Sequence, residues 1–306
     1  MSMLLRSFNL FTTYFPRVFL TILLLWSYWA LIFKVILILP IFFGIKGIIL
    51  ILILTYLFLI SIISYFKVIL IGPGSPIDFP ILIVNNYNED ENGNLIINED
   101  LRLNIKPPER FILNSIMIKR DGRFRFCSKC KCWKPDRSHH CSTCGTCILK
   151  MDHHCPWFSK CIGFKNHRYF IQFLINIEIY LIFITILSGW VLNQFFIKNR
   201  YPLKKFSFHI LFIFCLGIVF TICVTIFSSF TIYQLLKNKT TIENYEFQRY
   251  RRRHTNNNIG NVFDLGIRYN WKMVMGDRWW HQLVGFGVVE VVDDADDVVD
   301  RCTGHI

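Results

Sequence analysis

Long apolar runs alternate with polar stretches along this chain, and four of the runs are long enough to cross a membrane. The first extends from Val18 to Leu39, interrupted only by Lys34, and the second from Gly47 to Ile71. The third extends from about Phe170 to Phe196 and the fourth from about Phe206 to Leu236. Because a helix needs roughly 20 apolar residues to span the hydrocarbon core, the pattern predicts four transmembrane helices.

Short breaks define how the first two runs are connected. Pro40 breaks the first predicted helix, and Gly44 with Lys46 fits a tight turn, so the two spans must form an antiparallel hairpin. The run Gly72 to Pro76 ends the second helix through backbone rules alone. We do not interpret the first run as a signal peptide, because it is too long for an h-region and no small-residue cleavage site follows it.

Polar regions lie between and after the apolar runs. The first contains an Asn- and Glu-rich stretch from Pro80 to Arg110 that we expect to form a flexible loop, and no internal repeat is evident in the chain. The predicted organisation has five parts. They are a head with the first two spans (1–71), a loop (72–126), a cysteine-rich domain (127–170), the last two spans (171–236) and a tail (237–306).

Composition supports a membrane protein, and charge suggests its orientation. The 306 residues are 53% hydrophobic, above the usual share for a soluble domain, and carry a formal net charge of +13. Most Lys and Arg residues lie between Gly72 and Arg168 or after Leu236, and such residues are enriched on the cytoplasmic side. We therefore expect this loop and both termini in the cytosol, although the link from Lys198 to Lys205 is basic too. Nucleic acid is a less favoured partner, because the apolar spans dominate the chain.

Candidate chemistry is concentrated between the second and third spans. Eight of the eleven cysteines lie between residues 127 and 161, together with four histidines. Cys-x2-Cys pairs that begin at Cys127 and Cys141, with further Cys and His downstream, are typical of tetrahedral zinc sites and suit a disulfide framework less well. Two such sites need eight ligands. Six cysteines and two histidines would fill them, which leaves Cys132 and Cys155 over.

Cys155 stands in the sequence Asp152-His153-His154-Cys155. A thiol close to a histidine that follows a carboxylate has the components of a nucleophile, its base and a group that orients the base. A free cysteine has a pKa of about 8.5 and is mostly protonated at neutral pH. We therefore interpret Cys155 as the nucleophile, His153 as its base and Asp152 as the residue that orients His153. The alternative is a zinc-stabilised loop without chemistry.

A resemblance to a known family rests on this segment. The pattern C-x2-C-x9-H-C-x2-C-x2-C-x4-D-H-H-C-x5-C-x4-N-x3-F runs unbroken from Cys127 to Phe170 and resembles the cysteine-rich domain of the DHHC protein S-acyltransferases, or palmitoyltransferases. Thr240 to Glu243 (TTIE) resembles the TTxE motif of that family. Asn261 to Gly266, followed by Asn270-Trp271, resembles its C-terminal segment. The resemblance covers about residues 15 to 280.

The resemblance implies both a fold and a reaction. The fold class is an α-helical polytopic membrane protein with four transmembrane helices and a cytosolic zinc-binding DHHC domain between helices 2 and 3. The reaction is ping-pong transfer of a fatty acyl group from palmitoyl-CoA to a substrate cysteine through an acyl-enzyme on Cys155. Two structural Zn²⁺ ions are implied. Their ligand sets are Cys127, Cys130, His140 and Cys147, and Cys141, Cys144, His154 and Cys161.

The same resemblance implies residues that bind the acyl-CoA. They are Lys134, Arg137, His139, Trp157, Ser27 and Tyr180. The first three would meet the CoA phosphates, and the tryptophan would pack near the thioester. The serine and the tyrosine, in the first and third spans, would limit the length of the acyl chain. At 1.5 Å per helical residue, Tyr180 lies about 15 Å beyond Phe170, which is similar to the reach of a C16 chain.

Partners and location follow from the resemblance as well. The motifs GPGSPIDFP and DGRFRFC, with those above, are most similar to fungal family members of the vacuole membrane that support vacuole fusion. We therefore expect a multi-pass vacuolar protein whose partners are fatty acyl-CoA, the lipid bilayer and proteins with cytosolic, membrane-proximal cysteines, such as an armadillo-repeat vacuolar protein. Nucleic acid is not an expected partner.

Several positions stay open. Gly72 and Lys160 stand where the family usually has Asp and Asn, and Lys160 either stabilises the nucleophilic thiolate or faces solvent. Cys132 is either a spare ligand or an adventitious acylation site. Glu178, in the third span, is either catalytic or held by a neighbouring helix. The end after Gly285 is acidic and has no family counterpart.

Two other functions are compatible with parts of the sequence. One is a non-enzymatic zinc-containing membrane scaffold, but a scaffold does not need a spare cysteine beside a histidine that follows a carboxylate. The other is a membrane-tethered zinc finger that binds nucleic acid, but no recognition helix lies between the predicted ligands.

Overall fold

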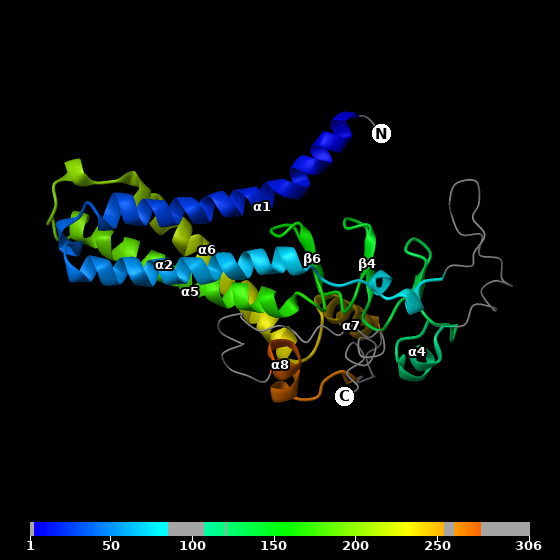
Figure 1. Ribbon diagram of the computed structural model, residues 1–306. Coiled ribbons are helices and arrows are strands. Elements are labelled where there is room, and N and C mark those ends of the chain that lie inside the picture. Colours follow the sequence, from blue (N-terminus) through cyan, green and yellow to red (C-terminus); the bar gives the residue numbers. More distant parts are fainter. Residues whose placement is uncertain (1–2, 85–106, 120, 254–259, 277–306) are drawn as a thin grey trace.

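Long helices form a bundle, and a small cysteine-rich domain lies at one end of it (Figure 1). The computed structural model describes residues 3–84, 107–119, 121–253 and 260–276. Most of the Asn- and Glu-rich stretch that was expected to be a loop lies outside these residues. The acidic end after Gly285 lies outside them entirely.

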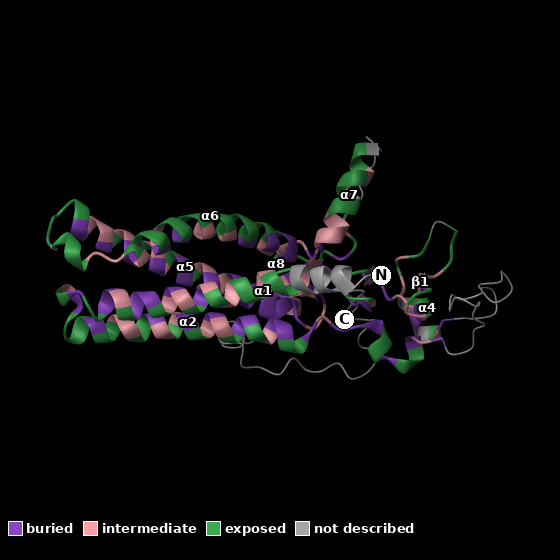
Figure 2. Cartoon of the chain, turned by 90° about the horizontal axis from the view of Figure 1, so that it is seen from above, coloured by how far each residue is buried: buried purple, intermediate pink, exposed green. Residues whose placement is uncertain are grey.

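Four described helices are long and apolar enough to cross a membrane, as the sequence predicts. The segments are Thr13–Ile36, Ile45–Ile71, His167–Phe196 and Phe208–Leu236. The first consists of most of α1 (Met3–Leu31) and the π-helix η1 (Ile32–Ile36), and the others are α2, α5 and α6. They run along a common axis, and many of the exposed residues lie on their outward faces (Figure 2).

α5 packs between α2 and α6 and is the most buried of the four spans. Toward α2, Asn176 Nδ2 donates a hydrogen bond to Ser64 Oγ at 3.4 Å. Toward α6, Gly217 lies so close to Thr185 that a Cβ at this glycine would collide with the threonine hydroxyl. Lipid provides no hydrophobic force that brings helices together, so close packing at small residues and polar contacts hold such bundles.

Short connections join the spans at the end remote from the cysteine-rich domain, which we call the far end. The 3-10 helix η2 (Pro40–Phe42) links η1 to α2 and begins with proline. Gly44 follows with a φ of 79°, a left-handed conformation that favours glycine. A second 3-10 helix, η5 (Leu203–Lys205), links α5 to α6.

Three antiparallel hairpins make up the cysteine-rich domain. They pair β1 (Phe126–Cys127) with β2 (Cys132–Trp133), β3 (His139–Cys141) with β4 (Thr146–Ile148), and β5 (His153–Cys155) with β6 (Lys160–Ile162). The turns contain residues of positive φ at equivalent places, namely Lys131, Gly145 and Ser159. Because the hairpins recur every 14 residues, the expectation of no internal repeat is wrong. The repeat keeps its backbone shape but only part of its residue types.

The segment after α2 holds this domain against the helix bundle. It contains the short helices η3 (Pro76–Asp78), η4 (Pro80–Leu82) and α4 (Glu109–Asn114). Ser75 Oγ donates to the Cys147 carbonyl at 2.6 Å, and the Leu149 amide donates to the Gly74 carbonyl at 3.1 Å. The second span is therefore connected directly to the middle hairpin.

Two helices follow the last span, α7 (Thr241–Arg253) and α8 (Ile267–Met275). α8 packs against α5 and α6, and Asn270 Nδ2 donates to the Leu236 carbonyl at the end of α6, at 2.8 Å. Asn238 Nδ2 donates to the Phe263 carbonyl at 2.6 Å. These bonds return the tail to the end of the bundle that carries the hairpins.

Candidate active site

The first candidate metal site joins the first two hairpins. Its four donors are Cys127, Cys130, His140 and Cys147. His140 Nδ1 lies 3.6, 3.2 and 3.8 Å from the three thiols, in that order. With Zn–S of about 2.3 Å and Zn–N of about 2.0 Å, the sulfur-to-nitrogen edge of a tetrahedron is about 3.6 Å. The four donors therefore fit a zinc ion.

The second candidate site joins the second and third hairpins. Its donors are Cys141, Cys144, His154 and Cys161. His154 Nδ1 lies 3.6, 3.4 and 3.6 Å from the three thiols, in that order. The Cys144 and Cys161 sulfurs are 3.6 Å apart, close to the tetrahedral edge of about 3.8 Å. Both donor sets are those named in the sequence analysis.

Each site would fasten one hairpin to the next. Two thiols come from the turn of one hairpin, and the other two donors face each other across the following hairpin. His140 lies opposite Cys147, and His154 lies opposite Cys161. Since four protein donors complete each tetrahedron, zinc here would crosslink the fold and leave no open coordination position.

The third hairpin has the shape of a metal-binding turn but lacks its second thiol. Cys155 occupies the position of the first cysteine of the repeat, and Phe158 occupies the position of the second. Phe158 is buried and packs against Phe170 and Phe173, with ring centroids 5.9 and 5.2 Å away. Cys155 is therefore held in a ligand-like position outside both metal clusters.

Asp152 is buried and orients His153. Its Oδ2 lies 2.6 Å from His153 Nδ1, and the carboxylate accepts hydrogen bonds from the Thr241 amide at 2.7 Å and the Thr241 hydroxyl at 2.9 Å. Burial alone would raise the pKa of Asp152. The hydrogen bond from His153, the charges of His167 and His153, and the bond from Thr241 lower it to about 2. The carboxylate is therefore ionised at neutral pH.

His153 lies between this carboxylate and Cys155. Its ring makes edge-to-face contacts with Phe170 at 5.4 Å and Phe227 at 6.3 Å. No nitrogen or oxygen of the described residues bonds its buried Nε2 atom. Burial alone would lower the pKa of His153, but Asp152 and the nearby Cys155 thiol raise it to about 9. Because Asp152 engages Nδ1, Nε2 is the atom left to exchange a proton with the thiol.

The loop after Cys155 is anchored to the first two spans. Tyr65 of α2 donates its hydroxyl to the Trp157 carbonyl at 3.0 Å, and Ser159 Oγ donates to the Thr13 carbonyl of α1 at 2.6 Å. Tyr65 is fully buried. This tyrosine was not predicted from the sequence, although a hydroxyl within an apolar run is the kind of signal that marks an internal contact.

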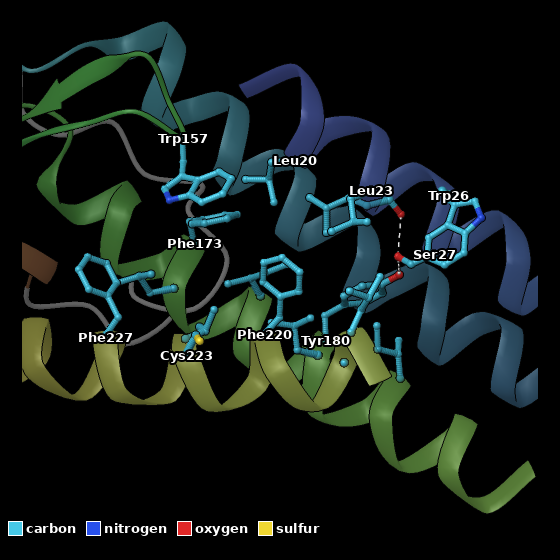
Figure 3. Close-up of a pocket in the computed structure, with 18 of the residues that line it drawn as sticks. Leu20, Leu23, Trp26, Ser27, Trp157, Phe173, Tyr180, Phe220, Cys223 and Phe227 are labelled. Carbon is cyan, nitrogen blue, oxygen red and sulfur yellow. Dashed lines mark hydrogen bonds between the residues drawn. The ribbon is translucent and has the colours of Figure 1, made fainter. Parts of the chain in front are cut away.

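An apolar cavity of about 280 Å³ extends from Cys155 into the bundle (Figure 3). Side chains of α1, α5 and α6 form its walls. Trp157 lies near the Cys155 end and is 42% exposed. Ser27 and Tyr180 lie at the other end, where their hydroxyls are 2.8 Å apart across α1 and α5. The structure thus brings both predicted chain-length residues to the deep end of the cavity.

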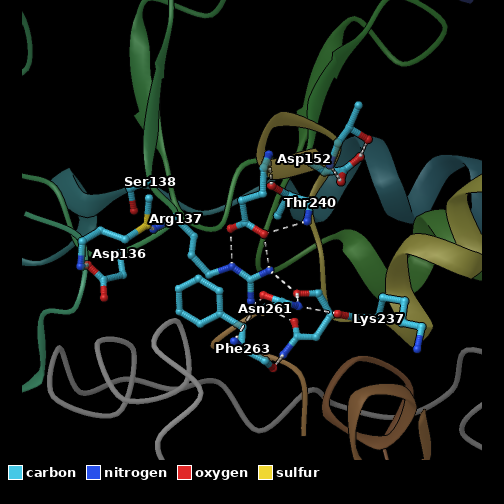
Figure 4. Close-up of polar contacts among 12 residues, drawn as sticks. Asp136, Arg137, Ser138, Asp152, Lys237, Thr240, Asn261 and Phe263 are labelled. Atoms are coloured by element: carbon cyan, nitrogen blue, oxygen red, sulfur yellow. Dashed lines mark hydrogen bonds and ion pairs between the residues drawn. The ribbon is translucent and has the colours of Figure 1, made fainter. Parts of the chain in front are cut away.

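Arg137 is 1% exposed, and its guanidinium is occupied within the protein (Figure 4). Nε and Nη2 donate to the Glu243 carboxylate at 2.6 and 2.8 Å, and Nη1 and Nη2 donate to Asn238 oxygens, each at 2.8 Å. The guanidinium carbon lies 4.4 Å from the centre of the Phe263 ring. The expectation that Arg137 meets CoA phosphates is therefore corrected. It links the hairpins to the junction of α6 and α7.

The other two residues assigned to the phosphates lie close together and are half-buried. Burial and the charges of Arg125 and Lys134 lower the pKa of His139 to about 4, so this histidine is neutral at pH 7. Its Nε2 has no hydrogen-bond partner among the described residues. Contacts from Lys134 and His139 to CoA stay predictions.

Two positions that the sequence left open have definite surroundings. Cys132 is fully buried opposite Cys127, with its thiol beside that of Cys147, which does not suit an accessible acylation site. Glu178 accepts a hydrogen bond from Ser228 Oγ of α6 at 2.6 Å. This bond supports the interpretation that a neighbouring helix holds the carboxylate.

Comparisons with known proteins agree with this geometry. Residues 120–248 match the family described as DHHC palmitoyltransferase. The chain is 42% identical to Palmitoyltransferase PFA3 of Candida albicans over 288 residues, which are 87% of this chain and 75% of the relative. It is 35% identical over 332 residues to Palmitoyltransferase PFA3 of Debaryomyces hansenii, with coverage of 92% and 80%. It is 32% identical over 276 residues to Palmitoyltransferase ZDHHC20 of Homo sapiens, with coverage of 87% and 72%.

Proposed function

This chain belongs to the DHHC palmitoyltransferase family and is a protein S-acyltransferase, and on that premise we propose that it works through a thioester on Cys155. The acyl donor in this proposal is a fatty acyl-CoA, with palmitoyl-CoA preferred. The acyl group passes first to Cys155 and then to a cysteine of a protein substrate. The mechanism is therefore ping-pong.

One observation supports this role above all others. Cys155 lies outside both metal clusters, lines the apolar cavity, and stands beside the Asp152–His153 pair. No other described cysteine combines these three properties. Cys132 lies outside the cavity, and Cys223 lines it from α6, away from the described histidine–carboxylate pair.

In the first step, His153 Nε2 accepts the proton of the Cys155 thiol. The thiolate attacks the carbonyl carbon of the acyl-CoA thioester, and the bond from that carbon to the CoA sulfur breaks. The leaving CoA thiolate takes the proton from His153. Asp152 supports this step because an ionised carboxylate on Nδ1 stabilises the imidazolium that forms.

In the second step, a substrate thiol gives its proton to His153 and attacks the acyl-enzyme carbonyl. The bond from the acyl carbon to Cys155 breaks, and the Cys155 thiolate regains the proton. Each step replaces one thioester with another of similar stability, so the reaction free energy of each step is small. Catalysis is then mainly the supply of a deprotonated, correctly placed thiol.

Zinc has a structural role in this proposal. Ions in the two closed sites would keep the three hairpins in register, and the second site would hold the Cys155 hairpin through His154 and Cys161. The acyl chain would lie in the cavity with its end near Ser27 and Tyr180. Lys134, His139 and Trp157 would contact the CoA part.

Orientation and location complete the proposal. Excess Lys and Arg in the loop between α2 and α5 and in the tail favour the cytosolic side for the hairpins and both termini. A nucleophile at the membrane end of that domain suits substrate cysteines close to the membrane. The resemblance of the sequence motifs to fungal family members of the vacuole membrane supports a vacuolar location, a role in vacuole fusion and an armadillo-repeat vacuolar protein as one substrate.

The experiment uses full-length protein in lipid nanodiscs with palmitoyl-CoA, in the presence and absence of a cysteine peptide. Wild-type protein is expected to release about one equivalent of CoA without peptide and to turn over with it, as in ping-pong kinetics. Cys155→Ser should release none in either case while keeping its zinc. Transfer by a zinc-replete Cys155→Ser variant would refute the acyl-enzyme. Absence of transfer by the wild type would favour a zinc-containing scaffold.

A further inference from the structure

At the deep end of the cavity, remote from Cys155, an aromatic contact joins α1 to α6. Trp26 of α1 lies beside Ser27 and lines the cavity (Figure 3). Its ring centroid is 5.8 Å from that of His209, in the first turn of α6. Elsewhere along the cavity the two helices form facing walls, with Leu20 and Leu23 on α1 and several side chains of α6 across the space. The contact therefore bridges the two walls where the cavity ends.

His209 also contacts a second tryptophan that is not part of the cavity wall. Trp29 of α1 makes an edge-to-face contact with His209, at 5.6 Å and an interplanar angle of 88°. Lys34 Nζ lies 5.3 Å from the centre of the Trp29 ring. The imidazole is thus in contact with two indoles on successive positions of one helix face, three residues apart.

Ile213 connects this contact to the size of the cavity. It lines the cavity one turn after His209 on α6 and is 2% exposed. On the α6 wall, space beyond Ile213 would lie toward the first turn of that helix, where His209 meets Trp26. Because lipid does not drive helices together, side-chain contacts such as this one hold α1 against α6 at that point.

We propose that Trp26, His209 and Trp29 form a clasp that closes the α1–α6 side of the cavity and so sets the longest acyl chain that the enzyme accepts. The inference rests on the proposed function, in which the cavity holds the acyl chain. The Ser27–Tyr180 hydrogen bond closes the α1–α5 side, and the clasp closes the other side. His209 acts as a positioning residue for Trp26. Loss of the imidazole frees the indole and opens room for chains longer than C16.

The test is competition between C16, C18 and C20 acyl-CoA for transfer to Cys155 in nanodiscs. His209→Ala should raise the C18-to-C16 ratio by about tenfold, the scale set by a methylene in an apolar pocket. Trp29→Ala should shift the ratio in the same direction, although Trp29 does not line the cavity. His209→Phe, which keeps a planar ring, should retain the wild-type preference for C16. Phe212→Ala is the matched control, since Phe212 lies on the same helix, is 58% exposed and is not part of the cavity.

The outcomes separate the clasp from the proposed function. An unchanged ratio in His209→Ala, while Tyr180→Ala shifts it, would overturn the clasp and leave the acyl-enzyme intact. A shift of equal size in Phe212→Ala would overturn it too, because the effect would then be a general loosening of α6. Failure of the wild type to acylate Cys155 would instead overturn the proposed function.

Discussion

At the scale of single residues, the site depends on the turn of the third hairpin, which lacks the second cysteine that the first two turns have. The first two hairpins place two thiols each around a metal site, and the third keeps Cys155 but has Phe158 at the second position. The thiol of Cys155 therefore belongs to neither cluster of possible metal ligands. Its neighbour His153 is fixed by Asp152, which is in turn fixed by Thr241.

Replacing His153 with alanine should remove the proton acceptor of Cys155. Burial alone would lower the pKa of His153, but Asp152 and the nearby Cys155 thiol raise it to about 9, so the acid–base state of the histidine, and with it the wild-type rate, should change little between about pH 7 and 9. The variant should acylate about 100-fold more slowly at pH 7 and recover as pH rises toward the ordinary thiol pKa of about 8.5. Single-turnover CoA release across this range measures it. An unaltered pH profile would remove His153 from the mechanism.

The sequence predicted the two clusters of possible zinc ligands, because their spacing is local, and the role of Cys155 as nucleophile stays a prediction. Cys-x2-Cys spacing and the run from Asp152 to Cys155 are visible within a few residues. Arg137 was assigned wrongly for the opposite reason. Its partners Glu243 and Asn238 lie about 100 residues later, and only the fold shows that they occupy the guanidinium. Tyr65 was missed for the same reason, since the carbonyl that it bonds belongs to Trp157.

At the scale of elements, helix α7 and the hairpins share one ion pair. Glu243 closes the first turn of α7, where its carboxylate accepts the Thr240 amide at 2.9 Å and its own amide donates to Thr240 Oγ1 at 3.2 Å. This reciprocal capping holds Glu243 against Arg137. The TTIE motif therefore has two contacts with the site. Thr241 holds Asp152, and Glu243 holds Arg137.

Glu243→Gln should destabilise the protein at neutral pH. Burial alone would raise the pKa of Glu243, but Arg137 and the Thr240 amide hold it below the ordinary 4.5. The stabilisation is therefore fully present above pH 4.5 and is lost as pH falls below that value. Removing one charge of a mostly buried pair should cost about 2 kcal/mol, or about 4 °C or more in Tm. Glu246→Gln, at an exposed position of the same helix, is the control. Equal Tm values for the two variants at pH 7 would contradict the account.

Changes at the deep end of the cavity should alter chain-length preference. Tyr180→Ala removes a fully buried ring and should favour C18 over C16, whereas Ser27→Phe adds volume and should favour C14. Competition assays with the three acyl-CoA donors measure the preference. If neither variant shifted it, the acyl chain would have to end elsewhere.

Hydropathy predicted the four spans, because each span must be apolar over its whole length. It did not predict the π-helical turn of η1, because the segment contains no proline or glycine that would indicate a departure from α-helical geometry. Nor did it predict which faces of the spans meet. α2 and α6 are apolar on all sides, so the position of Gly217 against α5 follows from packing and not from pattern.

At the scale of the whole molecule, the two metal sites connect the hairpins in series. The first joins hairpins one and two, and the second joins hairpins two and three. The third hairpin is also held by Tyr65 from α2 and by Thr13 from α1. Zinc in the second site and the first two spans would therefore both hold the hairpin that carries Cys155.

Cys144→Ser should remove one of two bound zinc ions and abolish acylation. Cys144 is an exposed ligand of the second site, so the change creates no buried cavity but removes the link to the Cys155 hairpin. Elemental analysis and CoA release measure the two effects. Cys215→Ser is the control, because it also replaces an exposed thiol but lies in α6, outside the cavity and both clusters. Two zinc ions in an inactive Cys144→Ser protein would contradict the serial arrangement.

Peptide mapping shows directly whether the acyl group passes through Cys155. Wild-type protein is incubated with palmitoyl-CoA, quenched, digested and analysed by mass spectrometry before and after hydroxylamine. We expect a single hydroxylamine-sensitive palmitoyl group on the peptide that contains Cys155, and it should form before any transfer to substrate. A stable thioester on another cysteine such as Cys132, with Cys155 free throughout turnover, would contradict it.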